Sequence, residues 1–191
     1  MEDRGGHRRA AFVASTMPSA ASGGRARLRV GLDSDMAVND IEIERKYLLR
    51  ALPGRVAGAP SLEIDQGYLP GSRINERIRR AVGAGETRYY RTVKAGSGLS
   101  RIEIEEETTA LFFETVWPLT RGARVRKRRY LVPEGTDRWE IDEFLDRQGL
   151  VLAELELDRS DQRVVIPPWL AEVLDREVTD DRAYTNHALA R

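Results

Sequence analysis

The sequence predicts a mainly β fold of the α+β class, in which an antiparallel sheet able to close on itself is flanked by a few short helices. From Ile41 onward, apolar and polar residues alternate with the period of a strand that has one apolar face. Glycine and proline separate these segments, mostly by short turns, which favours an antiparallel meander. The eight candidate strands are 40–49, 63–69, 73–82, 86–94, 101–108, 122–131, 137–143 and 150–158.

Three short helices are expected between and after the strands. Thr109 can cap the segment ALFFETVW, which Pro118 ends. A Pro-Pro pair at 167–168 introduces a second helical segment, WLAEVLDRE. Residues 181–190 (DRAYTNHALA) are compatible with a last short helix, in which we interpret His187 as a surface or helix-packing residue rather than a metal ligand.

The chain length of 191 residues suits one folded domain, which we place at 39–191. Residues 1–38 are rich in Ala, Gly, Ser and Arg and show little periodicity, so we expect a disordered N-terminal extension. Met36 is an alternative start of the protein, because the first predicted strand begins almost directly after it.

The charge balance and the rare residue types exclude several classes of function. The 31 Lys and Arg residues match 31 Asp and Glu residues, so net charge draws the chain neither to nucleic acid nor to a membrane. The absence of cysteine and the presence of only two histidines exclude disulfides, thiol chemistry and histidine-rich metal sites. A metal would need carboxylate ligands, as Mg²⁺, Mn²⁺ or Ca²⁺ prefer. No apolar run approaches the ~20 residues of a membrane span, so a soluble cytoplasmic protein is expected.

Acidic residues recur at alternate positions in four of the predicted strands. Strand side chains alternate between faces, so Glu42, Glu44 and Lys46 share one face of the first strand. The other acidic sets of this kind are Glu103, Glu105 and Glu107, then Glu140 and Asp142, then Glu154 and Glu156.

Cations alternate in the same way on other strands. Arg77 and Arg79 share a face, Lys127 and Arg129 share another, and Lys94 ends the strand YYRTVK. By the same parity, Arg128 should point outward. Divalent cations prefer several carboxylate oxygens, whereas a polyphosphate needs several fixed cations, for which arginine is well suited. Together, the acidic and basic sets are what a site for both ligands requires.

A solvated sheet face is the simpler explanation for any single pair of alternating charges. The full set favours a site, because the opposite faces are apolar and the charged faces must therefore all point the same way. If the sheet closes with its apolar faces outward, the charges face a lumen, where they must be paired or bind a ligand. The apolar positions are Ile41, Ile43, Ile78, Ile102, Ile104, Ile141 and Leu155.

The segment Glu42-Ile43-Glu44-Arg45-Lys46 resembles the ExExK signature of the CYTH superfamily, also called triphosphate tunnel metalloenzymes. The resemblance covers about residues 40–190 and is closest to the compact bacterial branch that hydrolyses inorganic triphosphate. It implies a closed eight-stranded antiparallel barrel, or tunnel. Further segments in the family's order are IDQGYL (64–69), ERIR (76–79), TVKAGSGLSRIEIE (92–105), VRKRRY (125–130), WEIDEF (139–144), LAELEL (152–157) and EVTDDRAYTNHALA (177–190).

The resemblance also implies a role for each charged set. The residues that would grip the phosphate chain are Lys46, Arg77, Arg79, Lys94, Lys127 and Arg129. One or two divalent cations, Mg²⁺ or Mn²⁺, would be held by Glu42, Glu44, Glu154 and Glu156, assisted by Glu103, Glu105, Glu140 and Asp142. Relatives often carry a basic residue beside the tail tyrosine, where this chain has Ala183 and Thr185 around Tyr184.

The catalytic residues implied by the resemblance are Tyr68, Lys46, Glu154 and Glu156, with either glutamate orienting the attacking water. Tyr68 matches a position proposed as proton acceptor in this branch. Because a tyrosine pKa is ordinarily ~10, Tyr68 could act as a base only if cations such as Lys46 lower its pKa. Otherwise it would donate a hydrogen bond to phosphate.

The expected reaction is metal-dependent hydrolysis of inorganic tripolyphosphate to diphosphate and phosphate, by a monomer or a homodimer. An adenylate cyclase, or a hydrolase of thiamine or nucleoside triphosphates, is an alternative on the same fold. The absence of a base-recognition signature favours the inorganic substrate. A second alternative is a non-catalytic polyphosphate- or nucleotide-binding module, which would have no need of the acidic pairs.

Overall fold

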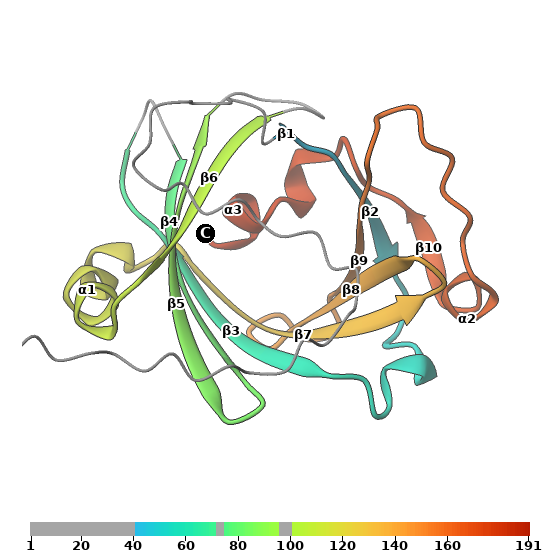
Figure 1. Cartoon of the computed structure of the whole chain (residues 1–191), viewed down its shortest axis with the longest axis horizontal. Helices are drawn as coiled ribbons and strands as arrows, with labels where there is room; N and C mark the ends of the chain where they lie inside the picture. The colour runs from blue at the N-terminus through green and yellow to red at the C-terminus, as the bar shows by residue number, and fades with distance from the viewer. Residues whose placement is uncertain (1–40, 72–74, 96–100) are drawn as a thin grey trace, which may run out of the picture. The chain divides into compact units, whose positions relative to one another are not determined.

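The computed structural model describes residues 41–71, 75–95 and 101–191, and ten strands of this part form one antiparallel sheet (Figure 1). The strands lie in the order β1-β6-β5-β4-β3-β7-β8-β9-β2-β10. The expected extension 1–38, with Met36, lies outside the described residues. The strands are β1 Ile41–Glu42, β2 Glu44–Leu49, β3 Ser61–Tyr68, β4 Asn75–Gly83, β5 Glu86–Ala95, β6 Arg101–Thr108, β7 Arg124–Glu134, β8 Asp137–Phe144, β9 Val151–Glu156 and β10 Leu174–Glu177.

Tight hairpins join neighbouring strands. Between β4 and β5, Ala84 has a φ of 50° and Gly85 a φ of 78°. A two-residue hairpin turn with both central φ angles positive matches the twist of the flanking strands, and it favours glycine. The short glycine-containing turn expected between these two strands is therefore confirmed.

The segment 41–49 contributes one strand near each end of the sheet order. Its first part, β1, pairs with β6, where Ile41 lies opposite Ile102. Its second part, β2, pairs with β9 from Glu44 opposite Glu156 to Leu49 opposite Val151. Only Ile43 separates the two parts. One short segment thus has partners on both of its sides.

All eight predicted strands are present, with ends that differ by up to three residues, and residues 40, 73 and 74 lie outside the described part. The predicted helix over WLAEVLDRE is wrong after its first turn, because α2 spans only Pro168–Ala171. The chain then continues as β10 along β2, and Arg50 N donates a hydrogen bond of 2.8 Å to Val173 O. The sequence analysis missed this strand because the segment's apolar spacing also fits a helix.

The remaining helices are short and locally determined. Thr109 caps α1 (Ala110–Val116) as predicted, because its Oγ1 accepts a hydrogen bond of 3.1 Å from Phe112 N. The predicted tail helix is divided into η3 (Arg182–Tyr184) and α3 (Asn186–Leu189), and the other short helices are η1 (Gly54–Val56) and η2 (Trp117–Thr120). Within the described residues, no helix is both long and apolar enough to cross a membrane.

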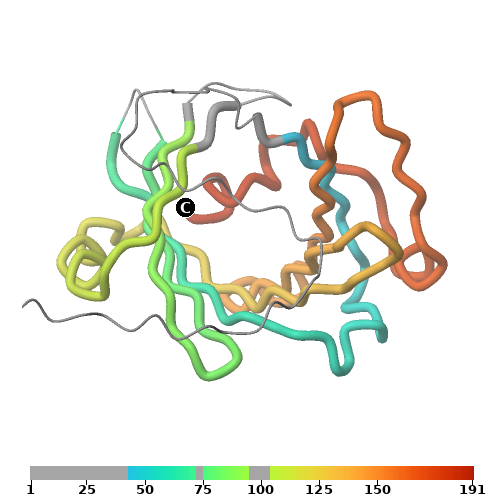
Figure 2. The backbone as a smooth tube through the Cα atoms, viewed as in Figure 1, coloured from blue at the N-terminus to red at the C-terminus, as the bar shows by residue number. Residues whose placement is uncertain are grey.

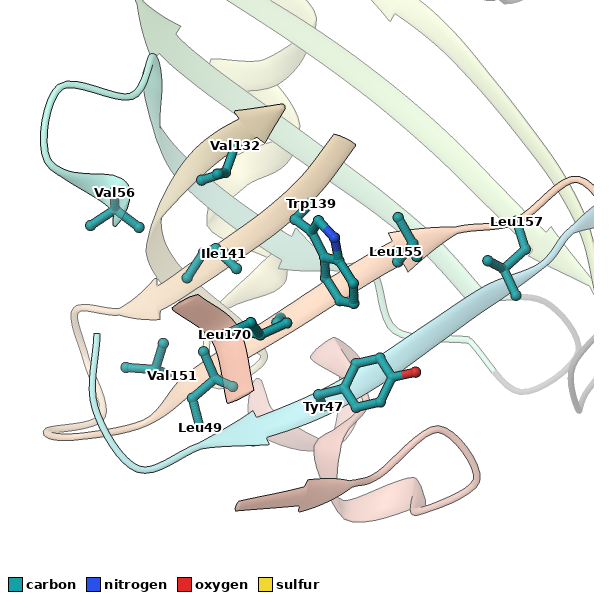
Figure 3. Close-up of a cluster of buried hydrophobic side chains, with 11 residues drawn as sticks. Tyr47, Leu49, Val56, Val132, Trp139, Ile141, Val151, Leu155, Leu157 and Leu170 are labelled. Atoms are coloured by element: carbon teal, nitrogen blue, oxygen red, sulfur yellow. The ribbon is translucent and has the colours of Figure 1, made fainter. Parts of the chain in front are cut away.

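The main hydrophobic core lies on the outer face of β2, β8 and β9, where α2 covers it (Figure 3). Leu170 of α2 is fully buried there beside Ile141 and Leu155. Trp139 lies between Tyr47 and Trp169, with ring centroids 5.7 and 6.4 Å away. Ile104 does not follow this pattern, because 57% of it is exposed on β6. The predicted apolar outer face is thus buried on one part of the sheet and solvated on another.

A second apolar cluster lies on the opposite, inner face of the sheet. It brings Tyr68, Phe144 and Leu152 together with Leu189 and Ala190 near the end of the sequence. Figures 1 and 2 show the segment around α3 turning into the curve of the strands. The inner face is therefore apolar next to α3.

Leu170→Ala should lower the free energy of unfolding by about 2–5 kcal/mol, because it removes a fully buried side chain and leaves a cavity. Urea denaturation measures this change. Val165→Ala is the control, since 75% of Val165 is exposed, and it should change stability by less than about 0.5 kcal/mol. Equal effects of the two variants would contradict the position assigned to the main core.

Candidate functional site

Strand register places the predicted charged residues whose side chains are described on one face of the sheet. Residues directly opposite each other in an antiparallel pair point to the same side. Lys46 lies opposite Glu154, and Arg129 opposite Asp142. On the other half of the sheet, Arg77 lies opposite Thr92, which in turn lies opposite Glu105. We call this surface the inner face.

A buried network of charges joins β2, β7, β8 and β9 on the inner face. Arg129 donates hydrogen bonds to both carboxylate oxygens of Asp142, at 2.6 and 2.7 Å, and to Glu154 at 2.7 Å. It also contacts Glu140. Lys46 Nζ lies 2.8 Å from the second oxygen of Glu154. This arrangement holds the cations in place before any ligand arrives.

Lys127 belongs to the same network and lies on the side of it that is next to α3. Its Nζ lies 2.5 Å from Asp142 Oδ2 and 3.2 Å from Asn186 Oδ1. Burial and the charge of Arg129 lower the pKa of Lys127 to about 8, against the attraction of Asp142. The amine therefore remains mostly protonated at neutral pH and can contact an anion.

Opposite charges determine the protonation of the acids in this network. Burial alone would raise the pKa of Glu154, but Lys46 and Arg129 hold it well below its usual range. The pKa of Asp142 is lowered in the same way by Arg129 and Lys127. Burial disfavours the charged form of Lys46, yet the charges of Glu154 and Glu44 raise its pKa. All of these groups are therefore charged near pH 7.

A second group of cations lies on the inner face of β4. Arg79 donates a hydrogen bond of 2.8 Å to Glu105, and Arg77 donates one of 3.3 Å to the same carboxylate. Thr92 Oγ1 also donates to Glu105, at 2.8 Å. The Arg79 guanidinium lies 4.8 Å from the centre of the Tyr90 ring. Two arginine side chains are thus held side by side by one glutamate.

Tyr68 is buried between these charges and the apolar cluster. Its hydroxyl accepts a hydrogen bond of 2.9 Å from Gln66 Nε2. Burial raises the pKa of Tyr68, and the charges of Arg77 and Lys46, which act in the opposite direction, do not offset it. This direction is unfavourable for a base and favours the alternative in which Tyr68 donates a hydrogen bond.

The other predicted residues lie at the margins of the network. Glu44 Oε1 lies 3.6 Å from Lys46 Nζ, while Glu156 is exposed at the end of β9. Lys94 is half-buried at the end of β5, opposite Glu103 in the register. The side chains of Glu42 and Glu103 lie outside the described residues.

The carboxylates are matched to cations rather than gathered around one point. Where side chains are described, no three Asp, Glu or His residues lie close enough to hold a metal ion. The donors are nevertheless of the kind that Mg²⁺ prefers, with Glu44 directly opposite Glu156 and Glu154 on the same face. Glu154 Oε1 is buried and lies 2.8 Å from Lys46 Nζ. The donor set therefore fits a hard divalent cation.

The cations of β7 point alternately to the two sides, as strand parity predicts. Arg128 points outward, as expected, and donates a hydrogen bond of 2.8 Å to Glu63. Arg124 donates to Trp117 O and lies 4.0 Å from the centre of that indole. Only Lys127 and Arg129 of this basic segment join the charged network described above.

Several uncharged polar residues of the inner face were not predicted from the sequence. Gln66 and Thr92 are buried there, and both could have been found from strand parity, since each lies two residues from a predicted site residue. Asn186 contacts the site from α3. No local signal could have found Asn186, because its contact depends on how the end of the sequence packs.

Comparison with known proteins gives two curated relatives, each of which is matched over nearly its whole length. An inorganic triphosphatase of Nitrosomonas europaea is 40% identical over 157 residues, which cover 78% of this chain and 96% of the relative. An inorganic triphosphatase of Acetivibrio thermocellus is 37% identical over 153 residues, which cover 78% of this chain and 93% of the relative.

Solved structures give a consistent result. A crystal structure of an inorganic triphosphatase matches with a TM-score of 0.56 and 34% identity, over 78% of this chain and 93% of that chain. No protein-family model matches the sequence.

Asp142→Ala should lower the free energy of unfolding by about 3–5 kcal/mol, because it leaves Lys127 and Arg129 buried without their main partner. Glu63→Ala removes a partly exposed ion pair with Arg128 and should cost about 0–1 kcal/mol. Urea denaturation of both variants makes the comparison. Similar losses would show that the inner network is solvated.

Acid should unfold the protein through the same network. The pKa values of Asp142 and Glu154 are lowered on folding from ordinary values of ~4, so the unfolded chain binds more protons in acid. Their contribution to stability is complete above about pH 5 and is lost as the pH falls through their folded values. Urea denaturation between pH 3 and pH 7 should show this slope, and Asp142→Asn should reduce it. If the free energy of unfolding of that variant depended on pH as steeply as that of the wild type, Asp142 would not be a source of the acid sensitivity.

Proposed function

This chain belongs to the inorganic triphosphatase family, and we propose that it hydrolyses inorganic tripolyphosphate to diphosphate and phosphate with a divalent cation, Mg²⁺ or Mn²⁺. It is an enzyme that acts on phosphoanhydride bonds. The observation that supports the proposed site most directly is the set of buried cations on one face of the sheet. Lys46, Arg77 and Lys127 contribute charge from three different strands.

We further propose that the sheet closes into the barrel of the CYTH superfamily. The support is the segment 41–49, which pairs with β6 through β1 and with β9 through β2. In a closed sheet the inner face becomes the wall of a tunnel. Charged residues from separate strands would then face one another across the substrate.

The cations bind and orient the phosphate chain. Arginine guanidinium groups suit phosphate oxygens because they present paired N–H donors in a plane. Arg77 and Arg79 are already held side by side by Glu105, so little further ordering is needed when substrate binds. Lys46, Lys127 and Arg129 neutralise charge on the other half, and Lys94 would contact one end of the chain.

The carboxylates supply the metal donors and orient water. Glu42, Glu44, Glu154 and Glu156 would hold the cation, with Glu103, Glu105, Glu140 and Asp142 assisting. When bound, the metal would offset charge on the phosphates. Glu154 stays ionised because its pKa is lowered, so it accepts a hydrogen bond from water and orients it rather than keeping its proton.

Hydrolysis then needs positioning and charge stabilisation more than covalent chemistry. The water oxygen forms a bond to the terminal phosphorus as the bridging P–O bond breaks, and diphosphate leaves. The proton of the water passes to a phosphate oxygen. Tyr68 donates a hydrogen bond to phosphate, because its raised pKa keeps the hydroxyl protonated at neutral pH.

Phosphate release by the full-length protein tests the proposal. The protein is incubated with tripolyphosphate, ATP or thiamine triphosphate, each with Mg²⁺, with Mn²⁺ or with a chelator. We expect metal-dependent release that is fastest on tripolyphosphate. Faster turnover of an organic triphosphate, or formation of cyclic AMP, would contradict the inorganic substrate, and binding without release would support a non-catalytic module.

Arg79→Ala should lower kcat/KM for tripolyphosphate by about 10²–10³-fold, the usual loss when one donor to a developing charge is removed. Arg80→Ala is the matched control, because Arg80 is the next residue on β4, points outward and pairs with Asp65 at 2.7 Å. Its kcat/KM should stay within about twofold of wild type. Equal losses of kcat/KM in the two variants would refute the proposal that the inner face binds the substrate.

A further inference from the structure

The segment that carries α3 is fixed firmly against the inner face. Leu189 and Ala190 pack into the apolar cluster with Val125, Phe144 and Leu152. Arg147 Nε donates a hydrogen bond of 2.9 Å to Leu189 O, and the same guanidinium donates one of 2.9 Å to Arg191 O. These contacts hold α3 from both its apolar side and its backbone.

The start of α3 reaches two residues of the proposed site. Asn186 Oδ1 accepts a hydrogen bond of 3.2 Å from Lys127 Nζ. The ring of the next residue, His187, packs against the ring of Tyr68, with centroids 4.8 Å apart and planes tilted by 48°. This tilted arrangement is one that aromatic pairs favour. The ring of Tyr68 is therefore held by a side chain that itself belongs to an anchored segment.

The hydroxyl of Tyr68 lies at the far end of the ring that His187 contacts. Gln66 donates to the oxygen at 2.9 Å, which fixes one side of the group and leaves the hydroxyl hydrogen for another acceptor. A tilt of the phenol ring about its Cα–Cβ bond would move the hydroxyl away from Gln66. The His187 ring lies against one side of the Tyr68 ring, so it restricts a tilt toward that side.

His187 acts in this contact as an uncharged ring. Burial and the charge of Arg191 lower the pKa of His187, so the imidazole is neutral near pH 7. A neutral aromatic ring can be replaced by phenylalanine with little change in shape. The packing of the ring can therefore be separated experimentally from its nitrogen chemistry.

We propose that His187 is a positioning residue, which holds the Tyr68 ring so that the hydroxyl meets the phosphate chain. The inference rests on the proposed function, because Tyr68 contacts substrate only if the inner face binds it. His187 does not touch the substrate in this account. Its effect on turnover should pass through Tyr68 alone.

A double-mutant cycle tests this role, since two residues that act as one unit give non-additive effects. The full-length wild type, His187→Ala, His187→Phe, Tyr68→Phe and the double variant Tyr68→Phe/His187→Ala are compared for kcat and KM on tripolyphosphate with Mg²⁺. Arg182→Ala, an exposed change on η3, is the control for effects of the segment as a whole. Thermal unfolding of each variant checks that it is folded.

We expect His187→Ala to lower kcat about tenfold, the scale of a modest misplacement of a catalytic group, with KM within about twofold. His187→Phe should restore most of kcat. In the Tyr68→Phe background, adding His187→Ala should change kcat by less than about twofold, because the hydroxyl is already absent.

Two results would overturn the inference while leaving the proposed function intact. One is an active wild type in which His187→Ala lowers only the melting temperature. The other is a loss of kcat from His187→Ala that is as large in the Tyr68→Phe background as in the wild-type background. A wild type that releases no phosphate would instead overturn the proposed function, and this positioning role with it.

Discussion

A charge buried inside a protein needs an opposite charge within contact distance, and this requirement organises the inner face of the sheet. Arg129 lies among Asp142, Glu140 and Glu154, and Lys46 lies against Glu154. Removing one member would leave the others buried without compensation, at a cost of several kcal/mol. The network therefore holds its cations in fixed directions. Such fixed charge is what a polyanionic substrate needs from a site that catalyses mainly by positioning.

Two apolar clusters support this network, one on each face of the sheet. The outer cluster around Trp139 and Leu170 fixes the strands that carry Lys46, Glu154 and Asp142 (Figure 3). The inner cluster holds α3 against the inner face, where Asn186 contacts Lys127. The charged network thus lies beside the inner cluster, and the sheet separates it from the outer core. The ionised groups can be buried there because each lies against an opposite charge.

Strand parity is a local property, and it predicted which charged residues share a face of the sheet. Alternation alone placed Glu154 with Glu156 and Lys127 with Arg129, and it directed Arg128 outward. What it could not predict are contacts between segments that are distant in the sequence. The ion pair of Arg77 and Arg79 with Glu105 depends on which strands are neighbours, and the His187–Tyr68 contact depends on how α3 packs. β10 was missed because its apolar spacing also suits a helix.

A crystal structure of the full-length protein with tripolyphosphate and Mg²⁺ is the measurement that tests the central claim most directly. The claim is that the inner face, with its preformed cations, is the substrate site. It predicts a phosphate chain in contact with Arg77, Arg79 and Lys46, and a metal ion bound by carboxylates of the same face. A phosphate chain bound instead to the outward arginines of β7, Arg126 and Arg128, would contradict it.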